Sequence, residues 1–105
     1  MTPLAIKVYK LLDTVPRGKV TTYKALAHKA GTKAYRAIGQ IMKNNPNAPE
    51  TPCHRVVASN GTLGGFLGKT DKKTLQKKID LLHSEGVKVR NNRILNFDKI
   101  CHVFN

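Results

Sequence analysis

The amino-acid sequence predicts one mainly α-helical domain with a small amount of β structure. Apolar residues recur at helical spacing in three separate segments, residues 4–15, 34–42 and 75–82. Glycine, proline and asparagine interrupt the chain between these segments, where only short stretches suggest strands. A chain of 105 residues suits one independent core, so we predict a single domain over residues 1–105.

The first helix is predicted over residues 4–15, where leucine and valine recur at i, i+4, i+7, i+8 and i+11. These positions form one apolar face. Pro16 and Gly18 are expected to end the helix, and residues 19–21 then form a short extended link.

The next two helices are predicted to form a helix-turn-helix. A threonine, Thr21 or Thr22, caps the second helix, which runs to Gly31. Thr32 caps the third helix, which residues 44–46 end. Two short helices joined by a tight turn are typical of a helix-turn-helix, although an ordinary helical hairpin remains the alternative. In the DNA-binding arrangement, the third helix would present to a groove Tyr35, Arg36, Ala37, Gly39, Gln40 and Lys43.

The second half of the chain mixes short strands with one more helix. Residues 53–58 predict a short buried strand or turn, and residues 64–68 predict a glycine-rich loop. Thr70 is expected to cap a fourth helix, which Gly86 ends. Residues 87–95 alternate weakly and predict a small hairpin at two adjacent asparagines. The expected architecture is a winged-helix-like DNA-binding domain.

The chain is strongly basic, with nineteen Lys and Arg residues against six Asp and Glu and a net charge of +13. Basic residues recur in nearly every segment, which favours contact with nucleic acid over a merely solvated basic surface. No run of about 18 apolar residues is present, and the N-terminus lacks the pattern of a secretion signal. We therefore expect no membrane partner, reduced cysteines, and a cytoplasmic (nucleoid-associated) or nuclear location.

Residues 52–57, Pro-Cys-His-Arg-Val-Val, are the strongest candidate for chemistry. They place a thiol, an imidazole and a permanent positive charge side by side. A thiol attacks as the thiolate, which a neighbouring imidazole and cations favour. Because adjacent side chains of a strand point to opposite faces, we expect His54 to act on Cys53 through a bridging water. A carboxylate is expected to orient the imidazole, and the chain has only six acids.

Two other interpretations of this cysteine compete. One is a buried structural cysteine beside a satisfied histidine, because free cysteine often serves as a small hydrophobic residue. The other is a zinc site with the possible ligands Cys53, His54, His83, Cys101 and His102. Their spacing lacks the short gap with which one loop wraps a zinc ion, so we predict no metal ion and no cofactor.

The glycine-rich loop of residues 64–68 has neither P-loop spacing nor the dinucleotide-binding spacing. We expect its backbone N–H groups to face a bound ring. Phe66 is available there for stacking on the same ring.

Four segments together resemble the O6-alkylguanine-DNA alkyltransferases. Residues 52–57 are similar to the active-site motif of that family, and residues 15–23 to the segment that leads into its helix-turn-helix. Residues 37–46 resemble its recognition helix and hinge, and residues 64–66 its substrate loop. The similarity runs in the right order over roughly residues 4–90, which makes it specific.

The resemblance implies a stoichiometric DNA repair protein that acts as a monomer. Its partner would be double-stranded DNA containing O6-alkylguanine, bound through the minor groove. The damaged base would be rotated out of the stack, as enzymes that modify bases require. Cys53 would then take the alkyl group irreversibly, so that each molecule reacts once.

The resemblance also implies individual roles. Arg36 would fill the space that the rotated base vacates, and His54 with Glu85 would activate Cys53 through water. Tyr23 would hydrogen-bond the purine as it leaves. The hinge residue would tie the recognition helix to the active site. The catalytic set is Cys53, His54, Glu85, Tyr23 and Asn45. The guanine site is lined by Met42, Val56, Gly65, Phe66 and Leu67, with the Val56 carbonyl reading the exocyclic amine. DNA contacts are implied for Thr22, Tyr35, Arg36, Ala37, Gly39, Gln40, Lys43 and Arg55.

The sequence departs from the family pattern in a few places. We expect the family's N-terminal domain to be missing. Tyr35 stands where a small residue is usual, and Leu67 where a small or polar residue is common. Cys101 has no role in the family. Three other functions stay open: an alkyltransferase-like lesion binder that transfers nothing, a winged-helix transcription regulator, and a thiol hydrolase. A tryptophan commonly replaces the acceptor cysteine of the lesion binders, so Cys53 favours transfer.

Overall fold

The computed structural model describes residues 2–67 and 69–104, and it confirms a mainly helical fold with little β structure. Gly68, the last residue of the predicted glycine-rich loop, lies outside the described part. The helices are α1 (Pro3–Asp13), α2 (Tyr23–Lys29), α3 (Tyr35–Lys43), α4 (Lys72–Ser84) and α5 (Phe97–Ile100), with one 3-10 turn, η1 (Cys53–Arg55). The strands are β1 (Thr21–Thr22), β2 (Val56–Val57), β3 (Val89–Arg90) and β4 (Arg93–Ile94).

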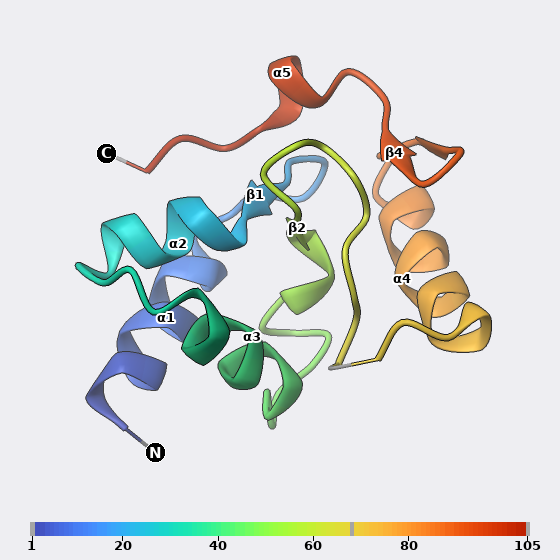
Figure 1. Ribbon diagram of the computed structural model, residues 1–105. Coiled ribbons are helices and arrows are strands. Elements are labelled where there is room, and N and C mark those ends of the chain that lie inside the picture. Colours follow the sequence, from blue (N-terminus) through green and yellow to red (C-terminus); the bar gives the residue numbers. More distant parts are fainter. Residues whose placement is uncertain (1, 68, 105) are drawn as a thin grey trace.

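Helices α1, α2 and α3 pack together on one side of the molecule (Figure 1). The α1 helix stops at Asp13, two residues before the predicted end, and Thr14 is its C-cap, ahead of Pro16. Val15 is nevertheless buried. The Thr22 hydroxyl caps α2 by accepting a hydrogen bond from the Ala25 N–H (3.0 Å). The contact of α2 with α3 across a short turn confirms the predicted helix-turn-helix.

Two predicted helix starts are wrong by one or two residues. Thr32 does not cap α3: Ala34 is the N-cap, and the Thr32 hydroxyl instead accepts from the Ala34 N–H (3.0 Å), just ahead of the helix. Thr70 does not cap α4 either, because Asp71 does so by accepting from the Thr74 N–H (3.1 Å). Aspartate is the stronger cap of the two neighbours, since its charge also complements the helix dipole.

Residues 53–58, predicted as a short buried strand or turn, contain both. Residues 53–55 form the 3-10 turn η1, and only Val56 and Val57 are extended. This strand pairs in parallel with β1, with Thr21 opposite Val56 and Thr22 opposite Val57. The start of the helix-turn-helix is therefore fastened directly to the residues that follow Cys53.

The predicted hairpin is confirmed, with β3 and β4 antiparallel and Val89 opposite Ile94. Its two turn residues, Asn91 and Asn92, have φ of 49° and 64°, the left-handed conformation that a two-residue hairpin turn requires. The four-residue α5 was not predicted, because so short a helix shows no apolar period. The segment after α5 returns to β1, where the Val20 N–H bonds the Ile100 carbonyl (3.0 Å).

The apolar residues form two cores that meet at the β1–β2 pair. One core joins α1–α3 to Cys53, Val56 and Phe66, and the other joins Val57 to α4 and the hairpin. Figure 1 shows α1–α3 and α4 on opposite sides, with the strand pair between them. Alternation along β2 sends Val56 into the first core and Val57 into the second. The acceptor turn thus lies at the junction of the two cores.

Candidate active site around Cys53

Cys53 opens the 3-10 turn and is almost fully buried, with 4% of its surface exposed. Its backbone N–H donates to the Thr51 carbonyl (2.9 Å). Burial raises the pKa of the Cys53 thiol, while a hydrogen bond with the Asn45 side chain and the charge of Lys78 oppose the rise. The resting sulfur is therefore a thiol, and a base must take its proton before it can attack.

His54 is placed to supply that base. Its Nε2 lies 3.0 Å from Oε2 of Glu85, and burial lowers the pKa of the imidazole although Glu85 opposes the shift. A neutral ring facing a carboxylate carries its proton on Nε2, which leaves Nδ1 as the acceptor. Nδ1 is buried and has no hydrogen-bond partner among the described residues. This unpaired acceptor suits a proton relay from Cys53.

The water relay was predicted from the alternation of side chains along a strand, but Cys53 and His54 do not lie in a strand. Cys53 and His54 lie in a 3-10 turn, where successive side chains do not alternate between opposite faces as they do in a strand. The expected pairing of His54 with Glu85 is nevertheless present. Glu85 is the residue that caps the C-terminal end of α4, so this helix brings the carboxylate to the acceptor turn.

Arg55 holds this carboxylate from a second direction. Its Nε donates to Oε1 of Glu85 (2.8 Å) and its Nη2 to Oε2 (2.6 Å). Its Nη1 donates to the Val15 carbonyl (2.7 Å), which ties the turn to the end of α1. Burial alone would raise the pKa of Glu85, but the hydrogen bonds from Arg55 and His54 lower it below its usual value. The half-buried Arg55 guanidinium is thus engaged by Glu85 and Val15, and its predicted DNA contact stays a prediction.

Asn45 links the end of α3 to the acceptor segment. Its Nδ2 donates to the Thr51 carbonyl (2.8 Å), and its Oδ1 accepts from the Asn47 N–H (3.0 Å). The same side chain opposes the rise in the pKa of the Cys53 thiol. One amide therefore connects the end of α3 to the loop that leads into Cys53.

Tyr23, the first residue of α2, faces the glycine-rich loop. Its hydroxyl donates to the Gly65 carbonyl (3.3 Å), and burial raises the pKa of this phenol, with a smaller contribution from Cys53. The phenol therefore keeps its proton and can donate it. Gly64 lies so close that a Cβ there would be 3.4 Å from the Tyr23 ring, and its φ of 70° also favours glycine.

The predicted guanine-site residues lie around the same place. Met42 and Phe66 are buried in the core that contains Cys53, and Leu67 packs on it in the left-handed conformation (φ 51°). The Val56 carbonyl accepts a hydrogen bond from the Lys78 ammonium (2.8 Å). Residues predicted to form one guanine site therefore lie in, or pack against, the core that contains the Cys53 thiol.

Comparison with known proteins identifies the family. The model of the 6-O-methylguanine DNA methyltransferase DNA-binding domain matches residues 3–87. The chain belongs to this family. The described elements α1 to α4, both strands of the β1–β2 pair and the acceptor turn fall within the matched residues.

Individual members of the family are similar over most of this chain. The methylated-DNA–protein-cysteine methyltransferase of Saccharolobus islandicus is 40% identical over 83% of the chain, which spans 53% of that relative. The methyltransferase crystal structure from Pyrococcus kodakaraensis is 42% identical over 83% of the chain and 48% of its own, with a TM-score of 0.70. The chain thus spans about half the length of these methyltransferases.

A shorter relative matches from end to end. The crystal structure of S. pombe Atl1, in complex with damaged DNA containing O6-carboxymethylguanine, superposes with a TM-score of 0.82 at 31% sequence identity. The match covers 97% of this chain and 96% of that one. The alkyltransferase DNA-binding domain here is therefore similar in size to Atl1.

The recognition helix of this alkyltransferase domain presents most of the predicted DNA-contacting residues at its surface. Tyr35, Arg36, Gln40 and Lys43 are exposed, and the remaining two positions are half-buried. Space is open beside Gly39, where an added Cβ would meet no atom within 4 Å. Thr22 differs, because its side chain is buried as the cap of α2.

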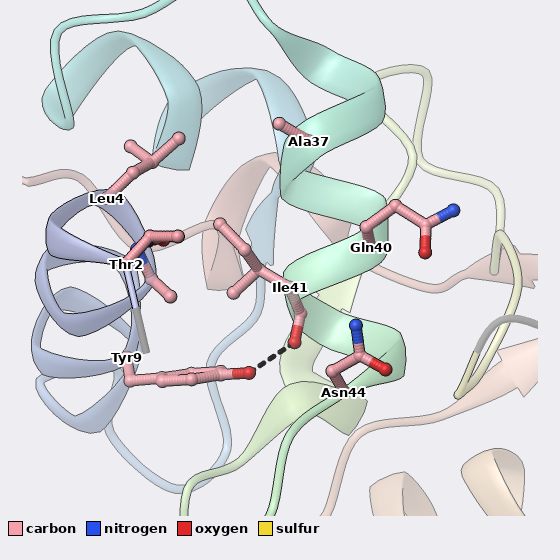
Figure 2. A pocket seen from close by; sticks show the side chains of 8 residues that line it. Thr2, Leu4, Tyr9, Ala37, Gln40, Ile41 and Asn44 are labelled. Carbon is pink, nitrogen blue, oxygen red and sulfur yellow. Dashed lines mark hydrogen bonds between the residues drawn. The ribbon is translucent and has the colours of Figure 1, made fainter.

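Two hollows flank the recognition helix of the domain. The larger, of about 810 Å³, lies between α1 and α3, where the Tyr9 hydroxyl donates a hydrogen bond to the Ile41 carbonyl (Figure 2). The smaller, of about 380 Å³, is lined by Tyr23, Lys24, Tyr35, Ala58 and Ser59. Of these two hollows, only the smaller is lined by a residue of the predicted catalytic set, Tyr23.

Sequence analysis missed Lys78, which is completely buried. The apolar face of α4 was predicted from Leu75, Ile79 and Leu82, and position 78 falls between them at i+3 from Leu75. A lysine on an apolar helical stripe was therefore a signal that could have been noticed.

Proposed function

We propose that this domain transfers an alkyl group from O6-alkylguanine in double-stranded DNA to Cys53. The observation that carries the proposal is a buried thiol beside a histidine whose Nε2 is engaged by Glu85 and whose Nδ1 is an unpaired acceptor. In a binding module, such an arrangement would leave a buried polar atom unsatisfied without any benefit. In a nucleophilic site, it supplies the base that the thiol requires.

The transfer step balances with these residues alone. The thiol proton of Cys53 passes to Nδ1 of His54, directly or through one water. The thiolate attacks the alkyl carbon, a carbon–sulfur bond forms, and the bond from that carbon to O6 breaks. The guanine leaves as an anion, which the Tyr23 phenol stabilises by donating a hydrogen bond to the purine, and the proton that His54 took from the thiol returns to neutralise it through water. The product is a thioether, so the protein is consumed.

DNA binding is assigned to the helix-turn-helix, with α3 in the minor groove. The small residues at positions 37 and 39 allow close approach of the helix backbone, and Arg36 is exposed at its start. Arg36 would occupy the stack after the guanine rotates toward the thiol. A net charge of +13 supplies affinity for the phosphates, which salt should weaken. The domain would act as a monomer in the cytoplasm, at the nucleoid, or in a nucleus.

A second candidate function is lesion binding without transfer. The end-to-end similarity to Atl1 bound to damaged DNA favours this alternative. The acceptor residue separates the two functions, because Cys53 supplies a sulfur and the His54–Glu85 pair supplies a base.

Intact-protein mass spectrometry tests the proposal after incubation with a duplex oligonucleotide that contains O6-methylguanine. We expect one added methyl group, mapped to Cys53 and absent from Cys53→Ala, which should still bind the lesion. An unmodified mass with tight lesion binding would instead establish a non-transferring damage sensor. Tight binding of one undamaged operator sequence would indicate a transcription regulator.

The role of Arg36 is tested with two substrates. Arg36→Ala should slow transfer from the duplex while leaving transfer from free O6-benzylguanine unchanged, because the free base needs no rotation out of a stack. Equal loss with both substrates would contradict the assigned role and indicate damage to the acceptor site.

A further inference from the structure

The Nζ of Lys78 lies in the interior of the protein and faces three backbone carbonyls. Its side chain is fully buried, and its Nζ lies 2.8 Å from the Val56 oxygen, 2.6 Å from the Leu63 oxygen and 2.8 Å from the Gly65 oxygen. A buried cation is costly unless its donors are satisfied. An ammonium has three N–H donors and a neutral amine has two, so three acceptors at these distances match the protonated form.

The three carbonyls belong to two different walls of the acceptor site. Val56 follows the acceptor turn directly, whereas Leu63 and Gly65 lie in the loop that carries Phe66. The Gly65 carbonyl also accepts from Tyr23 (3.3 Å), which belongs to α2. A single nitrogen from α4 therefore joins the acceptor strand to the loop, and through Gly65 to the phenol.

The same nitrogen influences the sulfur. Burial raises the pKa of the Cys53 thiol, and the positive charge of Lys78 opposes that rise. In the other direction, burial lowers the pKa of Lys78 to about 7, and Cys53 opposes that fall. The phenols of Tyr9 and Tyr23 also face Cys53. The other charged or titratable groups described at this turn are His54, Arg55 and Glu85, of which Arg55 and Glu85 largely neutralise each other.

We propose that Lys78 is a positioning residue for alkyl transfer: its ammonium fastens the guanine-site loop to the acceptor strand and stabilises the Cys53 thiolate. This proposal rests on the transfer function above. Lys78 forms no bond to the substrate and carries no proton in the reaction. It acts through the Val56 and Gly65 carbonyls, which it holds in place, and through its charge.

The variant Lys78→Met tests this role, because it keeps a long unbranched side chain while removing the charge and all three donors. Lys77→Met is the matched control, since Lys77 is an exposed lysine one residue away on the same helix. Reaction of Cys53 with iodoacetamide is followed across pH, with peptide mass spectrometry to separate it from Cys101. This reaction needs no guanine, so it reports on the thiolate whether or not the protein is an alkyltransferase.

We expect Lys78→Met to label Cys53 at least about tenfold more slowly at pH 7, the equivalent of one pH unit in thiol ionisation. Its rate should approach that of the wild type at high pH, where both thiols are ionised. Lys77→Met should follow the wild type throughout. Superimposed pH profiles of Lys78→Met and the wild type would overturn the stabilisation of the thiolate by Lys78.

A second measurement tests the fastening of the loop. The rate of transfer from free O6-benzylguanine, measured against its concentration, separates affinity from the maximal rate. Lys78→Met should lower both, because the pocket loosens and the thiolate is less stable. An unchanged affinity would overturn the loop role. Wild-type protein that never accepts the benzyl group would refute the transfer function, while a shifted labelling profile would still uphold the charge role.

Wild-type protein supplies a test should Lys78→Met not fold. In ¹⁵N-correlated spectra, a lysine ammonium whose three protons are all hydrogen-bonded in the interior should exchange slowly with water. We expect such a signal from Lys78, and we expect it to shift when Cys53 is alkylated. Failure to detect a slowly exchanging lysine ammonium at low temperature and pH 6 would overturn the proposal.

Discussion

The helix-turn-helix half of the molecule, α1–α3, and the acceptor half, which comprises η1, β2, the following loop and α4, bury different kinds of side chains. In α1–α3, the buried face consists of aliphatic residues such as Val8, Leu12 and Leu26. The acceptor half buries His54 and Lys78 and half-buries the Arg55–Glu85 pair. Aliphatic packing tolerates many substitutions of similar volume, whereas a buried polar network needs each partner.

This difference agrees with the proposed division between DNA binding and alkyl transfer. A scaffold that presents a helix to DNA needs only a stable apolar core, and α1–α3 have one. A reactive thiol needs a base, a carboxylate and a positive charge held away from water, where their interactions are stronger. Burying these groups in the acceptor half costs desolvation free energy, which their mutual hydrogen bonds and charges offset in part.

The largest combined effect, on stability and on thiol reactivity together, is expected from breaking the network at Glu85. Glu85→Gln keeps the shape of the side chain but leaves Arg55 without its negative partner, which should lower the free energy of unfolding by about 3 kcal/mol. It should also slow the labelling of Cys53 and alkyl transfer, since His54 loses its orienting carboxylate. Urea unfolding and iodoacetamide kinetics measure the two effects.

Asp80→Asn is the control for this variant, because Asp80 is an exposed acid on the same helix that bonds only Gln76 among the interactions described for it. It should change stability by less than about 0.5 kcal/mol. Equal stability of Glu85→Gln and the wild type would contradict the idea that the acceptor half depends on this ion pair.

A comparable loss of stability should come from the other half without any loss of thiol reactivity. Leu26→Ala removes a fully buried side chain from α2 and should cost about 2–5 kcal/mol. At a temperature where the variant is folded, its labelling profile at Cys53 should match the wild type. A shifted profile would mean that the two halves are not separable in the way that we describe. Leu95→Ala, at an exposed leucine, is the matched control.

The smallest effect is a dependence of stability on acid. The pKa of His54 is lowered by burial, and that of Glu85 is lowered by its hydrogen bonds despite burial. Both groups therefore bind protons more readily in the unfolded chain, so stability should fall as pH falls below about 6.5 and fall further below about 4.5. Urea midpoints should be flatter in Glu85→Gln below about pH 4.5, where this carboxylate is missing, but not near pH 6.5, because Glu85 opposes the fall in the pKa of His54. A midpoint that stays constant down to pH 4 would argue against this linkage.

Elements that depend on a regular apolar spacing or on adjacent residues could be predicted from the sequence. Helical spacing located α1, α3 and α4, and the asparagine pair located the hairpin turn. The Cys53–His54 motif and the pairing with Glu85 also followed from residue type and family resemblance. The exact helix starts did not, because two adjacent candidate caps compete and only their surroundings decide between Thr70 and Asp71.

The parts that escaped prediction depend on tertiary position. Arg55 looks like a DNA-contacting cation in the sequence, and only the folded chain brings Glu85 and the Val15 carbonyl to its guanidinium. Lys78 looks like one more basic residue on a basic helix. Its burial depends on carbonyls from β2 and the loop, which no local pattern encodes.

The parallel pair β1–β2 sets an order of folding. It joins Thr21 to Val56, residues far apart in the chain, and closing so long a loop has an entropic cost that earlier contacts must offset. The helices before β2 make mostly local contacts and can form first. The Glu85 carboxylate that orients His54 and the buried ammonium of Lys78 arrive later still, with α4. During synthesis, the sulfur should therefore remain an ordinary thiol until α4 has left the ribosome.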